Sequence, residues 1–216
     1  MSDVFEVDPA QSNIASEVLA AAARALAHGS LVVLPTETVY GIACRPDEPL
    51  ATERVFAAKR RPHGLNLPVL AAAADLAWEL GVPDDRAARL AEAFWPGPLT
   101  MVLPRSSRSR PWELGDRRES IALRVPDLAL TSSLLRRAGP MAATSANVSG
   151  EPPLSHRNEL VATFGQSVAV YLVLARGIAP PHGHPSTVVD LTGEELRVLR
   201  QGPLSEERVR AMVARL

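Results

Sequence analysis

Short apolar runs alternate with helix-forming stretches along most of this 216-residue chain. The run Leu31-Val32-Val33-Leu34 is closed by Pro35 and follows an alanine-rich stretch, 15–28, that ends before Gly29. Continuous apolar runs of this length are typical of strands that are buried on both faces. The alternation therefore predicts an α/β fold in which helices cover a sheet.

The same patterns predict the other elements. We expect helices over 15–28, 50–60, 73–80, 84–94, 128–137 and 156–164, and a final helix capped by Ser205. We expect strands over 31–34, 67–71, 99–103, 121–125, 141–144, 168–174, 187–191 and 195–199. Several neighbouring strands have no helix between them, so a mixed, partly parallel sheet is expected. The polar stretches 104–118 and 177–185 are predicted loops within one domain that spans 1–216.

Composition narrows the class of protein. Hydrophobic residues make up 46% of the chain and charged residues 22%, and the formal net charge is −1. This balance is that of an average globular protein, and it gives no reason to expect a nucleic-acid or membrane partner. The single cysteine, Cys44, excludes an intrachain disulfide. The first residues do not resemble a signal peptide, and no apolar run approaches the ~18 residues of a membrane span, so we expect a cytoplasmic protein.

The cations are almost all arginine. Of 23 Lys and Arg residues, only Lys59 is a lysine. Lysine is a compact, movable point charge, whereas arginine is a planar fork. Lys59 and Arg61 could contact one polyphosphate from different sides, although cations at a helix end also favour the helix dipole.

Three more polar segments lie at the ends of predicted strands: 35–41, 143–150 and 185–190. In open α/β sheets, ligands bind outside the strand ends. Small hydroxyl residues and a glycine in 143–150 permit close backbone approach to phosphate, although the segment lacks the ending of a Walker motif. Ser186 and Arg200 are predicted to point into one crevice. Each segment taken alone also fits an ordinary polar turn or hairpin.

Other chemistries find little support. The histidines His63, His156, His182 and His184 do not have metal-ligand spacing, and no Gly-x-Ser-x-Gly elbow is present. The basic stretch with Arg105, Arg108 and Arg110 lacks the interleaved aromatic residues of a base-stacking surface. We interpret it as a solvated loop.

Taken in order, seven segments resemble the YrdC-like family of threonylcarbamoyl-AMP synthases. They are 34–41, 59–62, 94–100, 123–126, 144–150, 185–190 and 199–200, and they span nearly the whole chain. The resemblance implies the short, single-domain form of the family, with a twisted mixed sheet, helices on both sides and a concave basic cleft. The chain departs from the family pattern at Leu65, Asn66, Pro153 and 40–43, which weakens only marginal nucleotide contacts.

The resemblance also implies a reaction. Family members join L-threonine, bicarbonate or CO2, and ATP into threonylcarbamoyl-AMP and release pyrophosphate. A separate transferase then places the threonylcarbamoyl group on an adenosine of certain tRNAs.

The resemblance further implies the site residues. By position, Lys59, Arg61, Ser145 and Asn147 are the implied catalytic and triphosphate-binding residues, and Thr100 and Arg200 are further ATP contacts. Thr38, Tyr40, Arg124, the backbone of Ala143 and Ser186 are the implied threonine contacts; Mg²⁺ is expected to bind through the ATP phosphates, without an assigned protein ligand.

Two alternatives stay open at this point. One is a paralogous enzyme of the same fold that handles another carbamoyl adenylate. The other is a double-stranded RNA-binding module, for which the net charge of −1 predicts only weak binding at physiological salt.

Overall fold

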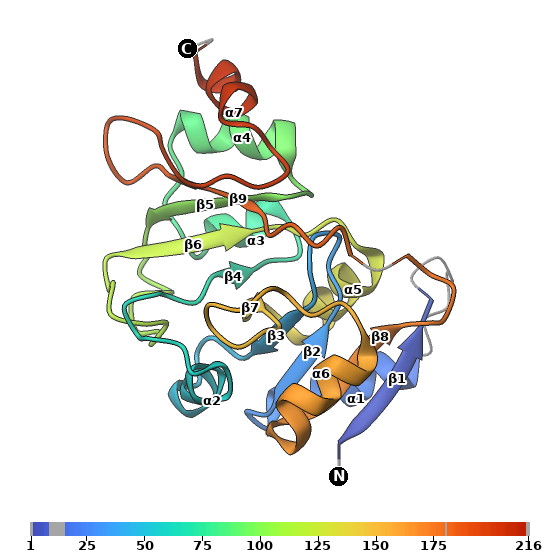
Figure 1. The fold of residues 1–216 in the computed structure, drawn as a ribbon. Helices are drawn as coiled ribbons and strands as arrows, with labels where there is room; N and C mark the ends of the chain where they lie inside the picture. Colours follow the sequence, from blue (N-terminus) through green and yellow to red (C-terminus); the bar gives the residue numbers. More distant parts are fainter. Residues whose placement is uncertain (1, 9–15, 180, 215–216) are drawn as a thin grey trace.

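The computed structural model describes residues 2–8, 16–179 and 181–214. Within them, ten strands form one sheet in the order β1-β8-β2-β3-β7-β4-β6-β5-β9-β10 (Figure 1). The strands are β1 (Asp3–Val7), β2 (Leu31–Leu34), β3 (Gly41–Cys44), β4 (Val69–Leu70), β5 (Leu99–Pro104), β6 (Ser120–Arg124), β7 (Met141–Ser145), β8 (Val168–Leu174), β9 (Thr187–Asp190) and β10 (Arg197–Arg200). The helices are α1 (Ser16–Ala27), α2 (Pro49–Lys59), α3 (Ala74–Trp78), α4 (Asp85–Phe94), α5 (Ala129–Ala138), α6 (Arg157–Phe164) and α7 (Glu206–Val213).

The sheet is mixed, as predicted. Strand β8 lies between β1 and β2 and is parallel to both, and the pairs β4–β6 and β5–β9 are also parallel. The remaining neighbours, including β2–β3 and β3–β7, are antiparallel. Strands from the N-terminal and C-terminal parts of the described chain therefore share one sheet.

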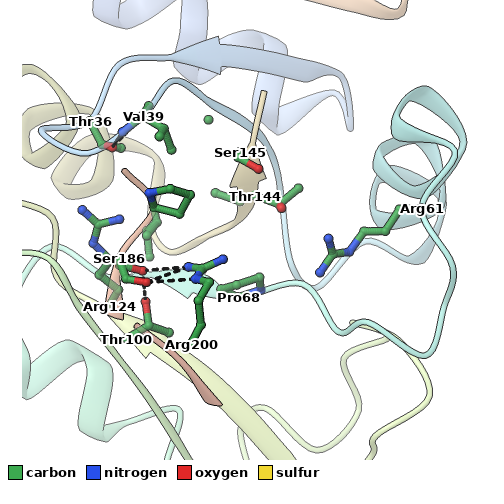
Figure 2. Close-up of a pocket in the computed structure, with 14 residues that line it drawn as sticks. Thr36, Val39, Arg61, Pro68, Thr100, Arg124, Thr144, Ser145, Ser186 and Arg200 are labelled. Carbon is green, nitrogen blue, oxygen red and sulfur yellow. Dashed lines mark hydrogen bonds between the residues drawn. The ribbon is translucent and has the colours of Figure 1, made fainter. Parts of the chain in front are cut away.

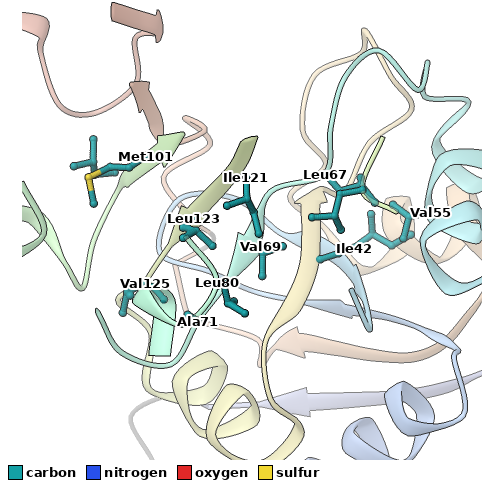
Figure 3. Packing of buried hydrophobic residues seen from close by; sticks show 14 of the residues in the cluster. Ile42, Val55, Leu67, Val69, Ala71, Leu80, Met101, Ile121, Leu123 and Val125 are labelled. Atoms are coloured by element: carbon teal, nitrogen blue, oxygen red, sulfur yellow. The ribbon is translucent and has the colours of Figure 1, made fainter. Parts of the chain in front are cut away.

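Helices cover both faces of the sheet, which confirms the predicted layering. Along β2, Leu31 and Val33 belong to one apolar cluster, whereas Val32 and Leu34 belong to the other. Successive strand side chains point to opposite faces, so these two clusters are the two sides of the sheet. Helices α1 and α5 pack on the second cluster, and α2, α4 and α6 pack on the first. Figure 3 shows the first cluster, where Val55 of α2 lies near Ile42 and Leu67.

Two strands were not predicted. Strand β1 lies at the sheet edge and is partly exposed, and β3 begins at Gly41, the last residue of the polar segment 35–41, where no strand was predicted. Strand β3 is completely buried between β2 and β7, so its small residues Gly41 and Ala43 are tolerated by pairing on both sides. The predicted strand 67–71 is reduced to β4, and the predicted strand 195–199 shifts to β10, which carries Arg200.

None of the helices in the described ranges combines the length and the apolar character that a bilayer crossing requires.

Candidate functional site

A cavity of about 140 Å³ lies where the turn after β2, the end of β7 and the start of β9 meet. Among the described residues that line it are three arginines, Arg61, Arg124 and Arg200, and no carboxylate. Figure 2 shows Arg61 on one side of the cavity and the group of Arg200, Ser186 and Thr100 on another. The cavity is therefore suited to an anionic ligand.

The C-terminus of helix α2 delivers two of the predicted cations in different directions. The helix ends at Lys59, and Arg60 adopts a left-handed conformation with φ 51° and ψ 41°. The backbone N–H of Arg61 then donates to the carbonyl oxygen of Phe56 at 2.9 Å. This reversal resembles a glycine C-cap, in which a left-handed residue ends the helix. It leaves Lys59 buried under the helix and places Arg61 at the cavity.

Lys59 is only 1% exposed and does not line the cavity. Its Nζ donates to the carbonyl oxygens of Ser145 and Asn147, at 2.5 and 2.6 Å, and lies 3.5 Å from Oδ1 of Asn147. The main-chain oxygen of Lys59 accepts a hydrogen bond from the N–H of Ser149 at 2.8 Å. Lys59 thus holds the loop that follows β7 through both its side chain and its main chain. Burial, with a smaller contribution from Arg61, lowers the pKa of Lys59 to about 8.

Asn147 is also turned into this loop. It is 6% exposed, and its Nδ2 donates to the carbonyl oxygens of Val148 and Glu151 at 2.8 and 2.7 Å. Ser145, in contrast, lines the cavity at the end of β7. The predicted Lys59, Ser145 and Asn147 are therefore brought together, with Ser145 at the cavity and the other two behind it.

A second network joins β5, β9 and β10. The guanidinium of Arg200 donates twice to the carbonyl oxygen of Ser186, from Nε at 3.0 Å and from Nη2 at 2.8 Å. The hydroxyl of Ser186 lies 2.7 Å from that of Thr100 (Figure 2). All three residues line the cavity, so the prediction that Ser186 and Arg200 share one crevice is confirmed.

A glycine permits this arrangement. A Cβ atom on Gly202 would lie 2.3 Å from the carbonyl oxygen of Pro185 and 2.6 Å from the backbone nitrogen of Thr187. Thr187 secures the same contact, because its Oγ1 accepts from the N–H of Gly202 and donates to the carbonyl oxygen of Leu204. The close approach of the two backbones fixes the position of the Ser186 segment.

Arg124 ends β6 and is 6% exposed. Its Nε donates to the carbonyl oxygen of Gly97 at 3.1 Å, and its Nη2 donates to Oε1 of Glu37 at 2.7 Å. Ala143 lines the cavity nearby, and its backbone N–H already donates to the carbonyl oxygen of Pro68. Of the predicted threonine contacts, Arg124, Ala143 and Ser186 therefore lie at the cavity.

The other two predicted threonine contacts do not line the cavity. Thr38 is buried and lies one hydrogen bond behind it, with its hydroxyl 2.9 Å from that of Thr36. The hydroxyl of Tyr40 accepts a hydrogen bond from the N–H of Leu174 at 2.9 Å, and its side chain borders a separate cavity near α6. The main-chain oxygen of Tyr40 accepts from Ala146, so Tyr40 does contribute to the shape of the loop after β7.

The electrostatics of the cavity favour an anion with more than one charge. Burial, together with the charge of Arg200, lowers the pKa of Arg61, and burial together with Arg124 lowers the pKa of Arg200. Three like charges thus lie close together in a partly desolvated site, and Glu37 pairs with one of them, Arg124. An incoming phosphate or carboxylate would relieve this repulsion.

The described residues contain no group of three or more His, Cys, Asp or Glu side chains placed to hold a metal ion.

Several cavity residues were not singled out from the sequence. Thr36, Val39, Thr144 and Pro185 lie in the polar segments that we expected at strand ends, so the segments were informative and the individual residues were not. Pro68 and Leu70 gave no signal, because they read as part of a buried strand.

Comparisons with known proteins show to which family the chain belongs. A family model described as Sua5/YciO/YrdC, telomere recombination, matches residues 24–202. A protein named threonylcarbamoyl-AMP synthase from Chromohalobacter salexigens is 38% identical over 183 residues, which is 83% of this chain and 96% of that protein.

Solved structures show the same fold. The crystal structure of E. coli YciO superposes with a TM-score of 0.86 at 24% identity, over 97% of this chain and 100% of that one. The crystal structure of P. abyssi Sua5 complexed with L-threonine gives a TM-score of 0.80 at 29% identity; it covers 99% of this chain, which spans 60% of that protein. The chain therefore belongs to the Sua5/YciO/YrdC family.

Proposed function

We propose that this protein is an L-threonylcarbamoyladenylate synthase, a nucleotidyltransferase that forms threonylcarbamoyl-AMP and pyrophosphate from L-threonine, bicarbonate or CO2, and ATP. The observation that carries the proposal is the cavity with Arg61, Arg124 and Arg200, which offers cations to both a polyphosphate and a carboxylate. The name of the relative at 38% identity and the L-threonine complex of P. abyssi Sua5 support the same reaction.

The triphosphate would bind at the side of the cavity that α2 and β10 border. Arg61 and Arg200 supply planar donors that match phosphate oxygens, and the Ser145 hydroxyl and Thr100 add polar contacts. The contacts of Lys59 and Asn147 support a positioning role, because both are used to hold the loop that presents Ser145. Mg²⁺ would bind through the phosphates and neutralise part of their charge.

Threonine would bind on the side of Arg124, whose guanidinium suits a carboxylate. Ser186 and the backbone of Ala143 also line the cavity and complete this threonine-binding wall. Thr38 and Tyr40 would act from behind this wall, Thr38 through Thr36 and Tyr40 through the loop after β7.

The chemistry requires little covalent participation by the protein. The neutral threonine amine attacks the carbon of CO2 and loses a proton as the carbamate forms; with bicarbonate as the carbon source, water leaves in this step. An oxygen of the carbamate then attacks the α-phosphorus, and the bond between the α- and β-phosphates breaks as pyrophosphate leaves. The side chains of one cavity hold both the threonine carboxylate and the triphosphate, which brings the carbamate and the α-phosphate together. The arginines neutralise the negative charge that develops on the phosphates.

The product fits a step in tRNA threonylcarbamoyladenosine synthesis. Because the threonylcarbamoyl group is still attached to AMP in the product, a separate tRNA threonylcarbamoyl transferase must consume the adenylate, through a contact that need only be transient. We propose a cytoplasmic location, no membrane partner, and at most weak direct RNA binding.

An assay of pyrophosphate release from ATP tests the proposal. We expect release that requires both L-threonine and bicarbonate, and that is lost in Arg61→Gln but kept in Arg60→Gln, its exposed neighbour. Release with another carbamoyl donor in place of threonine and bicarbonate would favour the paralogous enzyme. RNA binding of sub-micromolar affinity at physiological salt, without ATP turnover, would favour the RNA-binding alternative.

A further inference from the structure

Glu37 holds an acceptor that the described part of the protein does not use. Its Oε1 accepts a hydrogen bond from Nη2 of Arg124 at 2.7 Å, whereas its Oε2 is buried and has no hydrogen-bond partner. A buried polar atom without a partner destabilises the folded protein, and more strongly when it is charged. Such atoms are rare in folded proteins, and each calls for a physical explanation.

The partner of Glu37 has an unused donor. Arg124 uses Nε for Gly97 and Nη2 for Glu37, and none of the hydrogen bonds among the described residues uses its Nη1. Arg124 lines the cavity, and Glu37 lies one hydrogen bond behind it. Arg124 therefore has an unused donor at the cavity, and the Glu37 carboxylate behind it has an unused acceptor.

The Glu37 backbone is fixed, so only its side chain can adjust. The carbonyl oxygen of Glu37 accepts from the N–H of His182 at 3.3 Å, and that of Thr38 accepts from Gly183 at 2.8 Å. Rotation about the terminal torsion of a glutamate exchanges its two oxygens, so either oxygen can pair with Arg124, and a change of the preceding side-chain torsions turns the other toward the cavity without moving the backbone.

We infer that Glu37 and Arg124 together recognise an amino-acid zwitterion, with the α-carboxylate on Arg124 and the α-ammonium on the unused oxygen of Glu37. An α-amino acid carries these two opposite charges on adjacent atoms, which matches the adjacent opposite charges of the pair. This inference rests on the proposed function, because it assigns the amino acid to the cavity, and it adds a residue that selects for the ammonium.

The inference separates two roles for Glu37. If Glu37 only orients Arg124, its loss weakens every carboxylate ligand by the same factor. If Glu37 binds the ammonium, its loss weakens only ligands that carry one. Calorimetric titration of L-threonine and of 3-hydroxybutanoate, which is threonine without its amino group, distinguishes these roles in the presence of a non-hydrolysable ATP analogue.

In the wild-type protein we expect L-threonine to bind at least tenfold more tightly than 3-hydroxybutanoate. In Glu37→Gln this ratio should fall below threefold, while the affinity for 3-hydroxybutanoate changes little. Glu206→Gln is the matched control, because it removes an exposed carboxylate–arginine pair on α7, and it should keep the wild-type ratio. Glu37→Asp, which retains the carboxylate, should keep a preference for threonine even if Glu37→Gln fails to fold.

A Glu37→Gln protein that keeps the wild-type ratio overturns the inference and leaves the proposed function intact. The same holds if the wild-type protein binds both ligands equally. A wild-type protein that binds neither ligand overturns the proposed function, and this inference with it.

Discussion

The ammonium of Lys59 lies 2.5 Å from the carbonyl oxygen of Ser145 and 2.6 Å from that of Asn147. The only lysine of the chain thus joins the C-terminus of α2 to the loop after β7. A compact ammonium with three donors suits this group of oxygens, and a planar guanidinium does not. We therefore expect the identity of this cation to matter as much as its charge.

Replacing Lys59 should disorder the Ser145–Asn147 loop. Lys59→Met leaves two buried carbonyl oxygens without a donor, which we expect to lower the free energy of unfolding by about 1–3 kcal/mol. Lys59→Arg keeps the charge but is too large and too planar for the same oxygens. We expect both variants to lose at least ~100-fold in kcat/KM for ATP, equivalent to about 2.7 kcal/mol. Pyrophosphate release and thermal unfolding measure the two effects, and full activity in Lys59→Arg would refute the need for a point charge.

The titration of Lys59 can be observed directly. Because the chain has one lysine, labelling with ¹³C,¹⁵N-lysine gives a single side-chain NMR signal. Burial lowers the pKa of Lys59 to about 8, so we expect a titration midpoint near pH 8 in the folded protein. Bound ATP should raise this midpoint, because phosphate charges favour the ammonium. A midpoint above pH 10 without ATP would contradict the burial of Lys59.

The same pKa shift predicts how stability depends on pH. The pKa of an unfolded lysine is about 10.4, so between pH 8 and pH 10.4 the unfolded chain binds more protons at this residue than the folded protein. The contribution of Lys59 to the free energy of unfolding therefore rises with pH in this window and is lost as pH falls through 8. Relative to Lys59→Met, the wild-type protein should gain stability between pH 8 and pH 10 in urea unfolding experiments.

Arg200 and Arg197 offer a matched comparison on β10. Arg200 lines the cavity and holds Ser186, whereas Arg197 pairs with Asp190 and is largely exposed. We expect Arg200→Gln to weaken ATP binding by about 10–100-fold, as the loss of charge-assisted hydrogen bonds predicts. Arg197→Gln should leave the ATP dissociation constant unchanged, and equal losses in the two variants would contradict the assignment of Arg200 to the nucleotide.

Arg60 carries backbone strain that a glycine would relieve. Its φ of 51° lies in the left-handed region, where a side chain costs about 1–2 kcal/mol. The greater flexibility of glycine in the unfolded chain offsets part of the relieved strain, so we expect Arg60→Gly to stabilise the protein by about 0.5–1 kcal/mol. Each kcal/mol raises the Tm of a chain of this length by roughly 2–4 °C, so we expect a rise of about 1–4 °C. Arg60→Ala removes the same guanidinium but keeps the Cβ, and it should not raise Tm.

The sequence predicted those elements whose signal is local. Strands β2 and β8 are continuous apolar runs buried on both faces, and they were predicted with the bounds that the structure shows. Strand β3 was missed, because Gly41-Ile42-Ala43-Cys44 has little β propensity and becomes a strand by pairing with β2 and β7. Such a strand forms because it pairs with its neighbours in the sheet, and the local sequence pattern does not predict this pairing.

The segments that form the candidate site could be predicted from the sequence, but the orientations of their side chains could not. The resemblance placed Arg61, Arg124, Ser145, Ser186 and Arg200 in one site, and all five line one cavity. The orientation of Lys59 could not be read from α2, because its acceptors lie 86 and 88 residues further along the chain. The pairing of Glu37 with Arg124 spans 87 residues in the same way. Contacts of this range depend on the assembled sheet.

Mass spectrometry of the reaction mixture tests the central claim most directly. After incubation with ATP, Mg²⁺, L-threonine and ¹³C-bicarbonate, we expect a product that contains AMP, one threonine and one ¹³C-carbonyl group. Arg60→Gln should form the same product, and Arg61→Gln should not. Pyrophosphate release without any adenylate that carries both threonine and the ¹³C label would contradict the account.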